Sequence, residues 1–112
     1  MNKDQILEEI EGLLIVGEIG KDSQVWFEDE KDVFPVVSME IDEDNDLIIN
    51  VEDYEQGANI TSFHNNFDKM TSERGVNEVY VYVKEEDEFY HIDEVFGDDD
   101  NDLILLSKEG EV

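Results

Sequence analysis

Apolar residues in the N-terminal segment recur with helical spacing. The recurring positions are Ile6, Leu7, Ile10, Leu13 and Leu14. They share one face of a helix, and the glutamates between them fall on the other face. Asn2 and Gln5 have the spacing of a capping box at the start of this helix, and Gly17 weakens its end. We therefore predict a helix followed by a loop within residues 1–20.

From Ser23 onward the period of the apolar pattern changes to two. Three apolar stretches, 25–27, 33–41 and 47–51, are separated by acidic segments rich in turn-forming residues. Such a pattern is typical of antiparallel strands joined by short connections. It predicts a three-stranded antiparallel meander over residues 23–53.

A helical pattern returns in the middle of the chain. Its apolar positions are Ile60, Phe63, Phe67 and Met70. Gly75 suits the left-handed end of a helix, so we predict a helix within residues 59–75. Residues 77–109 then return to a period of two, which predicts a second three-stranded meander. The apolar stretches of this meander are 79–83, 89–96 and 103–106.

Two nearly identical acidic octets indicate an internal repeat. DEDNDLII begins at Asp42 and DDDNDLIL begins at Asp98. Aligning Phe34 with Phe89 makes the octets coincide after one inserted residue. Asp and Asn favour turns because their side chains bond the nearby backbone. The sequence thus predicts one α+β domain over residues 1–112, with two repeated three-stranded antiparallel β-meanders and both helices packed on the sheet.

Charge is the most unusual property of the composition. The chain has 33 acidic and 7 basic side chains, a formal net charge of −26. Self-repulsion at this density opposes compaction, and salt or a cationic partner would relieve it. The apolar fraction of 39% and the aromatic fraction of 10% nevertheless favour an ordered fold over an acidic disordered tail.

The residue types present argue against several chemistries. There is no cysteine for thiolate chemistry or disulfides, and no serine lies in a nucleophile motif. His64 and His91 are interpreted as structural residues. Arg74 is the sole arginine, which argues against direct binding of nucleic acid. We therefore expect neither an enzyme nor a cofactor, and we interpret VYVYV with Phe89 and Tyr90 as core with an acidic rim.

The pattern also bears on localisation. The N-terminal segment lacks the cationic start and the small-residue cleavage site of a signal peptide. No apolar run approaches the roughly 18–20 residues of a membrane span. We expect a cytoplasmic protein that does not bind membranes.

The aspartates of the two octets also have the spacing of a calcium loop. Positions 1, 3 and 5 of such a loop would be Asp42, Asp44 and Asp46 in the first copy and Asp98, Asp100 and Asp102 in the second. Position 12 would be Asp53 or Glu109. Position 6, which requires Gly, is Leu47 or Leu103, and a strand pattern follows instead of a helix. Acidic hairpin turns are therefore preferred to calcium loops, and no metal is predicted.

Rows of carboxylates on strands could imitate a nucleic acid. A duplex carries roughly one negative charge per 1.7 Å of its axis, and alternate strand residues lie roughly 6.6–6.8 Å apart on one face. Glu28, Glu30 and Asp32 would form one such row, and Glu86 with Glu88 another. The candidate partner-binding residues are these five together with Asp42, Glu43, Asp44, Asp46, Asp98, Asp99, Asp100 and Asp102. The candidate apolar anchors are Trp26, Tyr54 and Phe96.

In size, charge and lack of cysteine the whole chain resembles phage-encoded DNA-mimic inhibitors. These small acidic proteins block restriction enzymes, CRISPR nucleases, DNA glycosylases or host DNA-binding proteins. Ten Ile and six Lys against one Ala are typical of an AT-rich genome such as that of a low-GC bacterium or its phage. The inhibitors share no motif, so no residue role transfers. The resemblance implies a basic nucleic-acid-binding protein, such as a CRISPR nuclease or restriction enzyme, as the partner.

Two other interpretations remain open. The chain could be an acidic phage or bacterial domain whose charge is simply solvated, or an immunity protein that neutralises a basic nuclease toxin. The sequence leaves the oligomeric state undecided, and a dimer is compatible with it.

Overall fold

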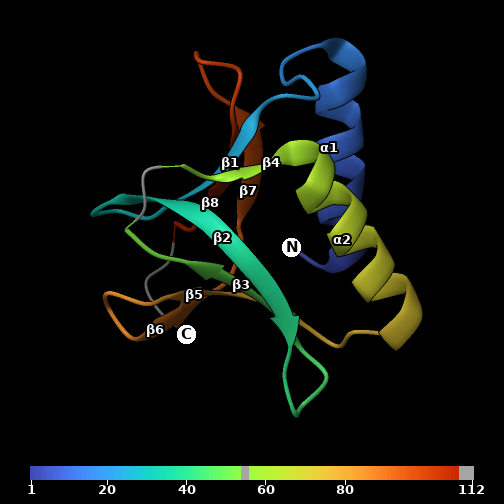
Figure 1. Cartoon of the computed structure of the whole chain (residues 1–112), viewed down its shortest axis with the longest axis vertical. Helices are drawn as coiled ribbons and strands as arrows, with labels where there is room; N and C mark the ends of the chain where they lie inside the picture. The colour runs from blue at the N-terminus through green and yellow to red at the C-terminus, as the bar shows by residue number, and fades with distance from the viewer. Residues whose placement is uncertain (54–55, 109–112) are drawn as a thin grey trace.

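The computed structural model of the chain describes residues 1–53 and 56–108. In this part of the chain it contains two helices and eight strands, which confirms the predicted α+β class (Figure 1). The helices are α1 (Lys3–Val16) and α2 (Ile60–Arg74). The strands are β1 (Gln24–Glu28), β2 (Val33–Ile41), β3 (Leu47–Val51), β4 (Ala58–Asn59), β5 (Val79–Val83), β6 (Glu88–Tyr90), β7 (Glu94–Gly97) and β8 (Leu103–Leu106).

Both helices begin and end as their sequences predict. The Asn2 side chain accepts the Gln5 N–H and the Gln5 side chain accepts the Asn2 N–H, so the capping box of α1 is present. Asn59 caps α2 by accepting the Thr61 N–H. Each helix ends at a glycine with positive φ, 79° at Gly17 and 59° at Gly75. Glycine adopts this left-handed conformation without a steric penalty.

The strands form one mixed sheet in the order β6-β5-β3-β2-β1-β8-β7, and the short β4 pairs with β1 outside this path. The neighbours β1–β2 and β2–β3 are antiparallel, as the predicted first meander requires. Two parallel pairs, β3–β5 and β1–β8, join the N-terminal half of the sheet to the C-terminal half. Because these pairs are parallel and distant in sequence, the alternation pattern could not predict them.

The predicted second meander over residues 77–109 is wrong. The expected strand 89–96 is interrupted, and its two parts, β6 and β7, lie at opposite edges of the sheet. β6 pairs with β5 and β7 pairs with β8, so this half contains two hairpins. The interruption arises because Ile92 is buried (1% exposed) and the backbone of Asp93 turns to donate to Leu106 O at 2.8 Å.

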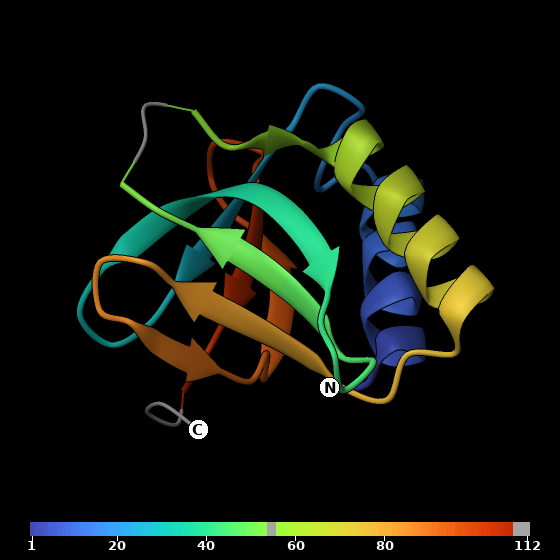
Figure 2. The same ribbon diagram turned by 60° about the horizontal axis from the view of Figure 1, so that its bottom comes forward.

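The sheet is strongly curled (Figure 2). Phe27 of β1 contacts Tyr90 of β6 with ring centroids 5.4 Å apart, although three strands separate β1 from β6 in the sheet order. The curl encloses a core of aliphatic and aromatic side chains. α1 and α2 lie side by side against one end of the sheet in both ribbon views, and they add Ile10 and Phe67 to the core.

The register corrects the alignment of the two halves by one residue. In the parallel pairs Leu47 lies opposite Val79 and Leu103 lies opposite Val25, so β5 corresponds to β1 residue by residue. The antiparallel partners then match Phe34 with Tyr90, not with Phe89, because Phe27 faces Phe34 and Val81 faces Tyr90. A slip of one residue exchanges the two faces of a strand. Phe34 and Tyr90 are accordingly both buried.

The two octets form the same turn, as their repetition predicts. The Asp42 carboxylate accepts the N–H groups of Asp44 at 3.0 Å and Asp46 at 2.9 Å. Asn45 has a φ of 63°, which Asn tolerates better than most residues. In the second octet the corresponding bonds to the Asp98 carboxylate are both 2.9 Å, and Asn101 has a φ of 64°.

The Asp98 turn bonds can be tested by comparing two substitutions. Asp98→Ala removes the acceptor of both N–H groups, so the free energy of unfolding should fall by about 1–2 kcal/mol. Asp98→Asn removes the same charge but keeps the oxygen acceptor, so its change should stay within about 0.5 kcal/mol. Urea unfolding at constant salt measures both. Equal losses in the two variants would contradict the role given to the hydrogen bonds.

Candidate interaction surface

Most candidate carboxylates lie in hairpin connections and not in rows along strands. β1 ends at Glu28, so Glu30 and Asp32 lie in the loop before β2. Glu86 lies in the turn before β6, and Glu88 begins that strand. The predicted strand rows are therefore wrong. The chain reverses early at the first site because the Asp29 carboxylate accepts the N–H groups of residues 31 and 32 at 2.8 and 2.7 Å.

The acidic loops fall into three places. The octet loops 42–46 and 98–102 lie at opposite ends of the long axis, at the bottom and top of Figure 1. Loops 29–32 and 84–87 lie together on the side away from the helices in both ribbon views. The two octets therefore cannot form one continuous ridge. The paired loops can present one continuous surface.

We call the surface around loops 29–32 and 84–87 the acidic end. Its carboxylates are Glu28, Asp29, Glu30, Asp32, Glu52, Asp53, Glu85, Glu86, Asp87 and Glu88. The end of β3 belongs to it because the Asp53 N–H donates to Glu85 Oε1 at 2.9 Å. Two lysines, Lys31 and Lys84, lie among these ten acids, and Lys84 Nζ is 3.1 Å from Glu52 Oε2. The acidic end thus has a large excess of negative charge.

Several octet carboxylates already serve the fold. Asp46 accepts the Glu78 N–H at 3.1 Å. Asp102 accepts the Gln24 N–H at 2.9 Å and the Trp26 Nε1–H at 3.2 Å. Trp26, a candidate anchor, is therefore half-buried and hydrogen-bonded. The octet carboxylates that remain exposed without such a role are Glu43, Asp44, Asp99 and Asp100.

Of the other two candidate anchors, Phe96 is half-buried on β7. Tyr54 lies outside the described residues.

The calcium-loop interpretation fails in its details. Asp42, Asp44 and Asp46 do bring carboxylate oxygens within 4.8 Å of one another. Yet their proposed twelfth-position partner, Asp53, lies beyond the other end of β3, and Leu47 at position 6 is fully buried in the core. Glu109, the partner in the second copy, lies outside the described residues. The grouping of the three aspartates follows from the turn itself.

An aromatic cluster covers the outer face of β5 and β6. Along β5 the valines are buried and the tyrosines face outward. Tyr82 and Phe89 have ring centroids 4.9 Å apart, Tyr80 and Phe89 form an edge-to-face pair at 6.4 Å, and Tyr80 and His91 are 5.0 Å apart. Of the four aromatic residues in this stretch, only Tyr90 enters the core, where it joins the valines of β5. The interpretation of the stretch as core with an acidic rim is therefore correct for the valines and Tyr90 and wrong for Tyr80, Tyr82 and Phe89. The strict Val–Tyr alternation is the signal for two faces.

Carboxylates border the aromatic cluster. Loss of hydration raises the pKa of the Tyr80 phenol above its usual 10.0, and the charges of Asp46 and Glu78 raise it further. The hydrogen bond that Tyr82 donates to Asp87 at 2.6 Å is the main cause of the raised pKa of Tyr82. The cluster thus lies in a region of negative potential, between the first octet and the acidic end.

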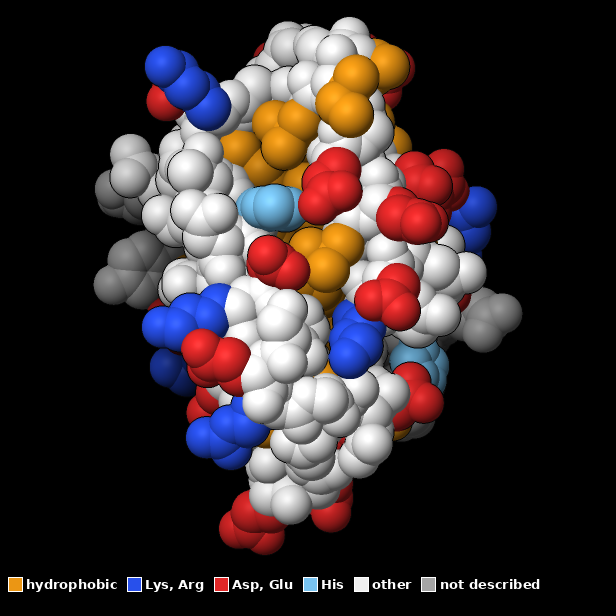
Figure 3. All heavy atoms as spheres, turned by 90° about the vertical axis from the view of Figure 1, so that its right-hand side faces the viewer, with side chains coloured by type: hydrophobic (Ala, Val, Ile, Leu, Met, Phe, Trp, Pro, Cys, Tyr) orange, Lys and Arg blue, Asp and Glu red, His pale blue; other side chains and the backbone are white. Residues whose placement is uncertain are grey.

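The helix side of the molecule has a different character. α2 contains two acidic and two basic residues. Figure 3 shows Lys and Arg side chains among Asp and Glu on this face, with apolar side chains in the furrow between the helices. His64 Nε2 lies 3.5 Å from Glu11 Oε1 and so links α2 to α1. The negative charge is therefore unevenly distributed over the surface.

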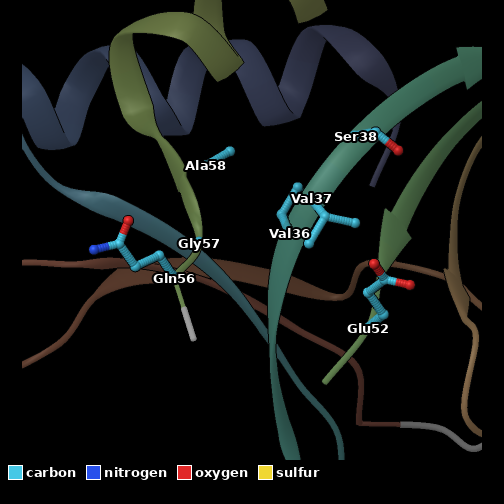
Figure 4. A pocket seen from close by; sticks show the side chains of 7 residues that line it. All are labelled: Val36, Val37, Ser38, Glu52, Gln56, Gly57 and Ala58. Atoms are coloured by element: carbon cyan, nitrogen blue, oxygen red, sulfur yellow. The ribbon is translucent and has the colours of Figure 1, made fainter. Parts of the chain in front are cut away.

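A cavity of about 610 Å³ opens where β2 leaves β1. Val36 and Val37 of β2 face Gly57 and Ala58 across it (Figure 4). Its carboxylate, Glu52, is the one paired with Lys84, and the remaining lining is aliphatic, backbone, Ser38 or Gln56. Among the described residues that line it, no nucleophile lies beside an unpaired base.

Comparison with protein-family models, curated proteins and solved structures finds no match to this chain. The part of the chain that the structure describes contains no helix with the length and apolar character needed to cross a membrane.

The Tyr82–Asp87 contact predicts a measurable titration. Because the folded pKa of Tyr82 is raised, its contribution to stability is complete below pH 10 and is lost as the pH rises through the folded pKa. Asp87→Ala removes the acceptor and the charge, so the pKa of Tyr82 should fall toward 10.0 while that of Tyr80 changes little. A ¹³C NMR titration of the tyrosine rings measures both. An unchanged Tyr82 pKa in the variant would contradict the contact.

Proposed function

We propose that this chain is an acidic inhibitor that occupies the basic nucleic-acid-binding groove of a target protein, such as a CRISPR nuclease or a restriction enzyme. The observation that supports this most is the concentration of ten carboxylates at the acidic end. A dense negative surface is drawn rapidly to a groove lined by Lys and Arg. While it is bound there, the groove cannot take its own polyanion.

Hydrogen bonds within the acidic end define the conformation of both of its loops. Asp29 fixes one loop through two backbone N–H groups. In the other loop Asp87 accepts the Tyr82 hydroxyl and Glu86 accepts the Tyr90 hydroxyl. Surfaces that are already ordered lose less conformational entropy on binding. These carboxylates can therefore act as a fixed array, as phosphates do on a duplex.

Matched charge variants test the surface. The first variant replaces acids of the acidic end: Glu30→Gln, Asp32→Asn, Glu85→Gln and Glu88→Gln. The control removes the same charge from the octets: Glu43→Gln, Asp44→Asn, Asp99→Asn and Asp100→Asn. Inhibition of DNA cleavage by purified CRISPR nucleases and restriction enzymes is measured over a range of salt concentrations. The first variant should be at least about ten-fold weaker and less salt-dependent than the wild type, and the control should change by less than about three-fold.

Two outcomes would contradict the proposal. Equal losses in the two variants would show that total charge, and not the acidic end, determines inhibition. A target that retains its DNA while the inhibitor is bound would exclude mimicry and would favour an immunity-type interaction. Competitor DNA should therefore displace the wild-type protein from any enzyme that it inhibits.

A further inference from the structure

The aromatic cluster is not needed to complete the core. Phe89 is 42% exposed, and Tyr80 and Tyr82 are half-buried on the outer face of the sheet. Their ring contacts are with one another and with His91, while the valines of β5 and Tyr90 fill the interior. Tyrosine and phenylalanine side chains are enriched in protein interfaces, and tyrosine is frequent among the residues that contribute most to binding.

The other half of the molecule shows that the fold does not require these rings. By the strand register, Tyr82 corresponds to Glu28 and Phe89 to Val33. Glu28 and Val33 occupy the same places in the other hairpin without forming an aromatic surface. The cluster is therefore a feature of one half that the repeated architecture alone does not explain.

The chemistry of the cluster suits a guanidinium group. Aromatic faces attract cations, and Arg stacks on them more readily than Lys because its planar group is less strongly hydrated. Carboxylates flank the rings on both sides: Asp46 and Glu78 lie near Tyr80, and Asp87 accepts the Tyr82 hydroxyl. A guanidinium stacked on a ring can reach a neighbouring carboxylate with its N–H groups.

We propose that Tyr80, Tyr82 and Phe89 form a binding surface for arginine side chains of a basic protein partner, with Asp46, Glu78 and Asp87 as flanking acceptors. This inference rests on the proposed function, and it specifies which side chains of the partner are bound. A second copy of this chain is disfavoured as occupant because each copy carries a charge of −26. A single-stranded nucleic acid is disfavoured by the same negative potential.

Two peptides of equal charge provide the probe. Nona-arginine and nona-lysine are titrated into the full chain at about 150 mM NaCl, where exposed charges are partly screened. We expect nona-arginine to bind at least about five-fold more tightly and to shift the NMR signals of the Tyr80, Tyr82 and Phe89 rings. In Tyr80→Leu/Phe89→Leu the preference should fall to less than about two-fold, with nona-lysine affinity nearly unchanged. Phe96→Leu, which changes an aromatic residue outside the cluster, should retain the preference.

Circular dichroism and thermal melting establish that each variant is folded. Should the double variant fail to fold, Phe89→Leu alone replaces it, because this exposed ring adds little to the core, and the preference should fall at least about two-fold. Equal affinity of the wild type for both peptides, or a preference that survives loss of the rings, would overturn the proposal. The proposal would also be overturned if the wild type formed a dimer, or bound oligothymidine, and the same variant abolished that interaction.

This test and the test of the proposed function fail independently. If the chain does not displace nucleic acid from any target, the arginine preference can still be present and the mimicry is wrong. If the preference is absent, the acidic-end variant can still lose inhibition, and the inference about the aromatic cluster alone is wrong.

Discussion

Mutual repulsion among carboxylates is the constraint that the rest of this structure must satisfy. With 33 acidic and 7 basic side chains, ion pairs can offset only a small part of the negative charge. In the loops, backbone N–H groups stabilise some of these carboxylates by hydrogen bonding. The carboxylates of Asp29, Asp42 and Asp98 each accept two of them. Hydrogen bonds to a charged acceptor are stronger than neutral ones, so the acids that burden the fold also fix its turns.

The octets show how this principle joins the two halves of the chain. Asn45 in the first octet donates to the carbonyl groups of Arg74 and Gly75 at the end of α2. Asn101 in the second octet donates to the carbonyl of Glu18, after α1. Each octet thus contacts the end of the helix that belongs to the other half of the chain. β3, which follows the first octet, pairs in parallel with β5, which follows α2. β8, which follows the second octet, pairs in parallel with β1, which follows α1. The repeated octets thus make two equivalent sets of contacts between the halves of the chain.

Local features were predictable from the sequence and distant pairings were not. The capping box at Asn2 and the octet turns depend on residues within five positions of one another, so their signals are present in the local pattern. The interruption at residues 91–93 depends on the different strands that pair with β6 and β7. The sequence pattern of residues 89–96 does not indicate those partners. The correspondence between the two halves has the same limit at Phe89. An alignment of the halves shifted by one residue paired it with the buried Phe34, whereas the register pairs it with the exposed Val33.

Comparison of the two halves also separates structural acids from those available to a partner. Asp102 accepts hydrogen bonds from the Trp26 side chain and from the Gln24 N–H at the start of β1. The corresponding Asp46 accepts the Glu78 N–H. Tyr80, the counterpart of Trp26, packs in the aromatic cluster instead. Where both halves agree, the fold explains the residue. Where they differ, as at Tyr82 and its counterpart Glu28, the shared fold alone does not explain the residue. Total charge cannot distinguish one basic groove from another, because every nucleic-acid-binding protein offers Lys and Arg to a polyanion. Selectivity requires a feature that a duplex lacks, and a ring surface beside fixed carboxylates is such a feature.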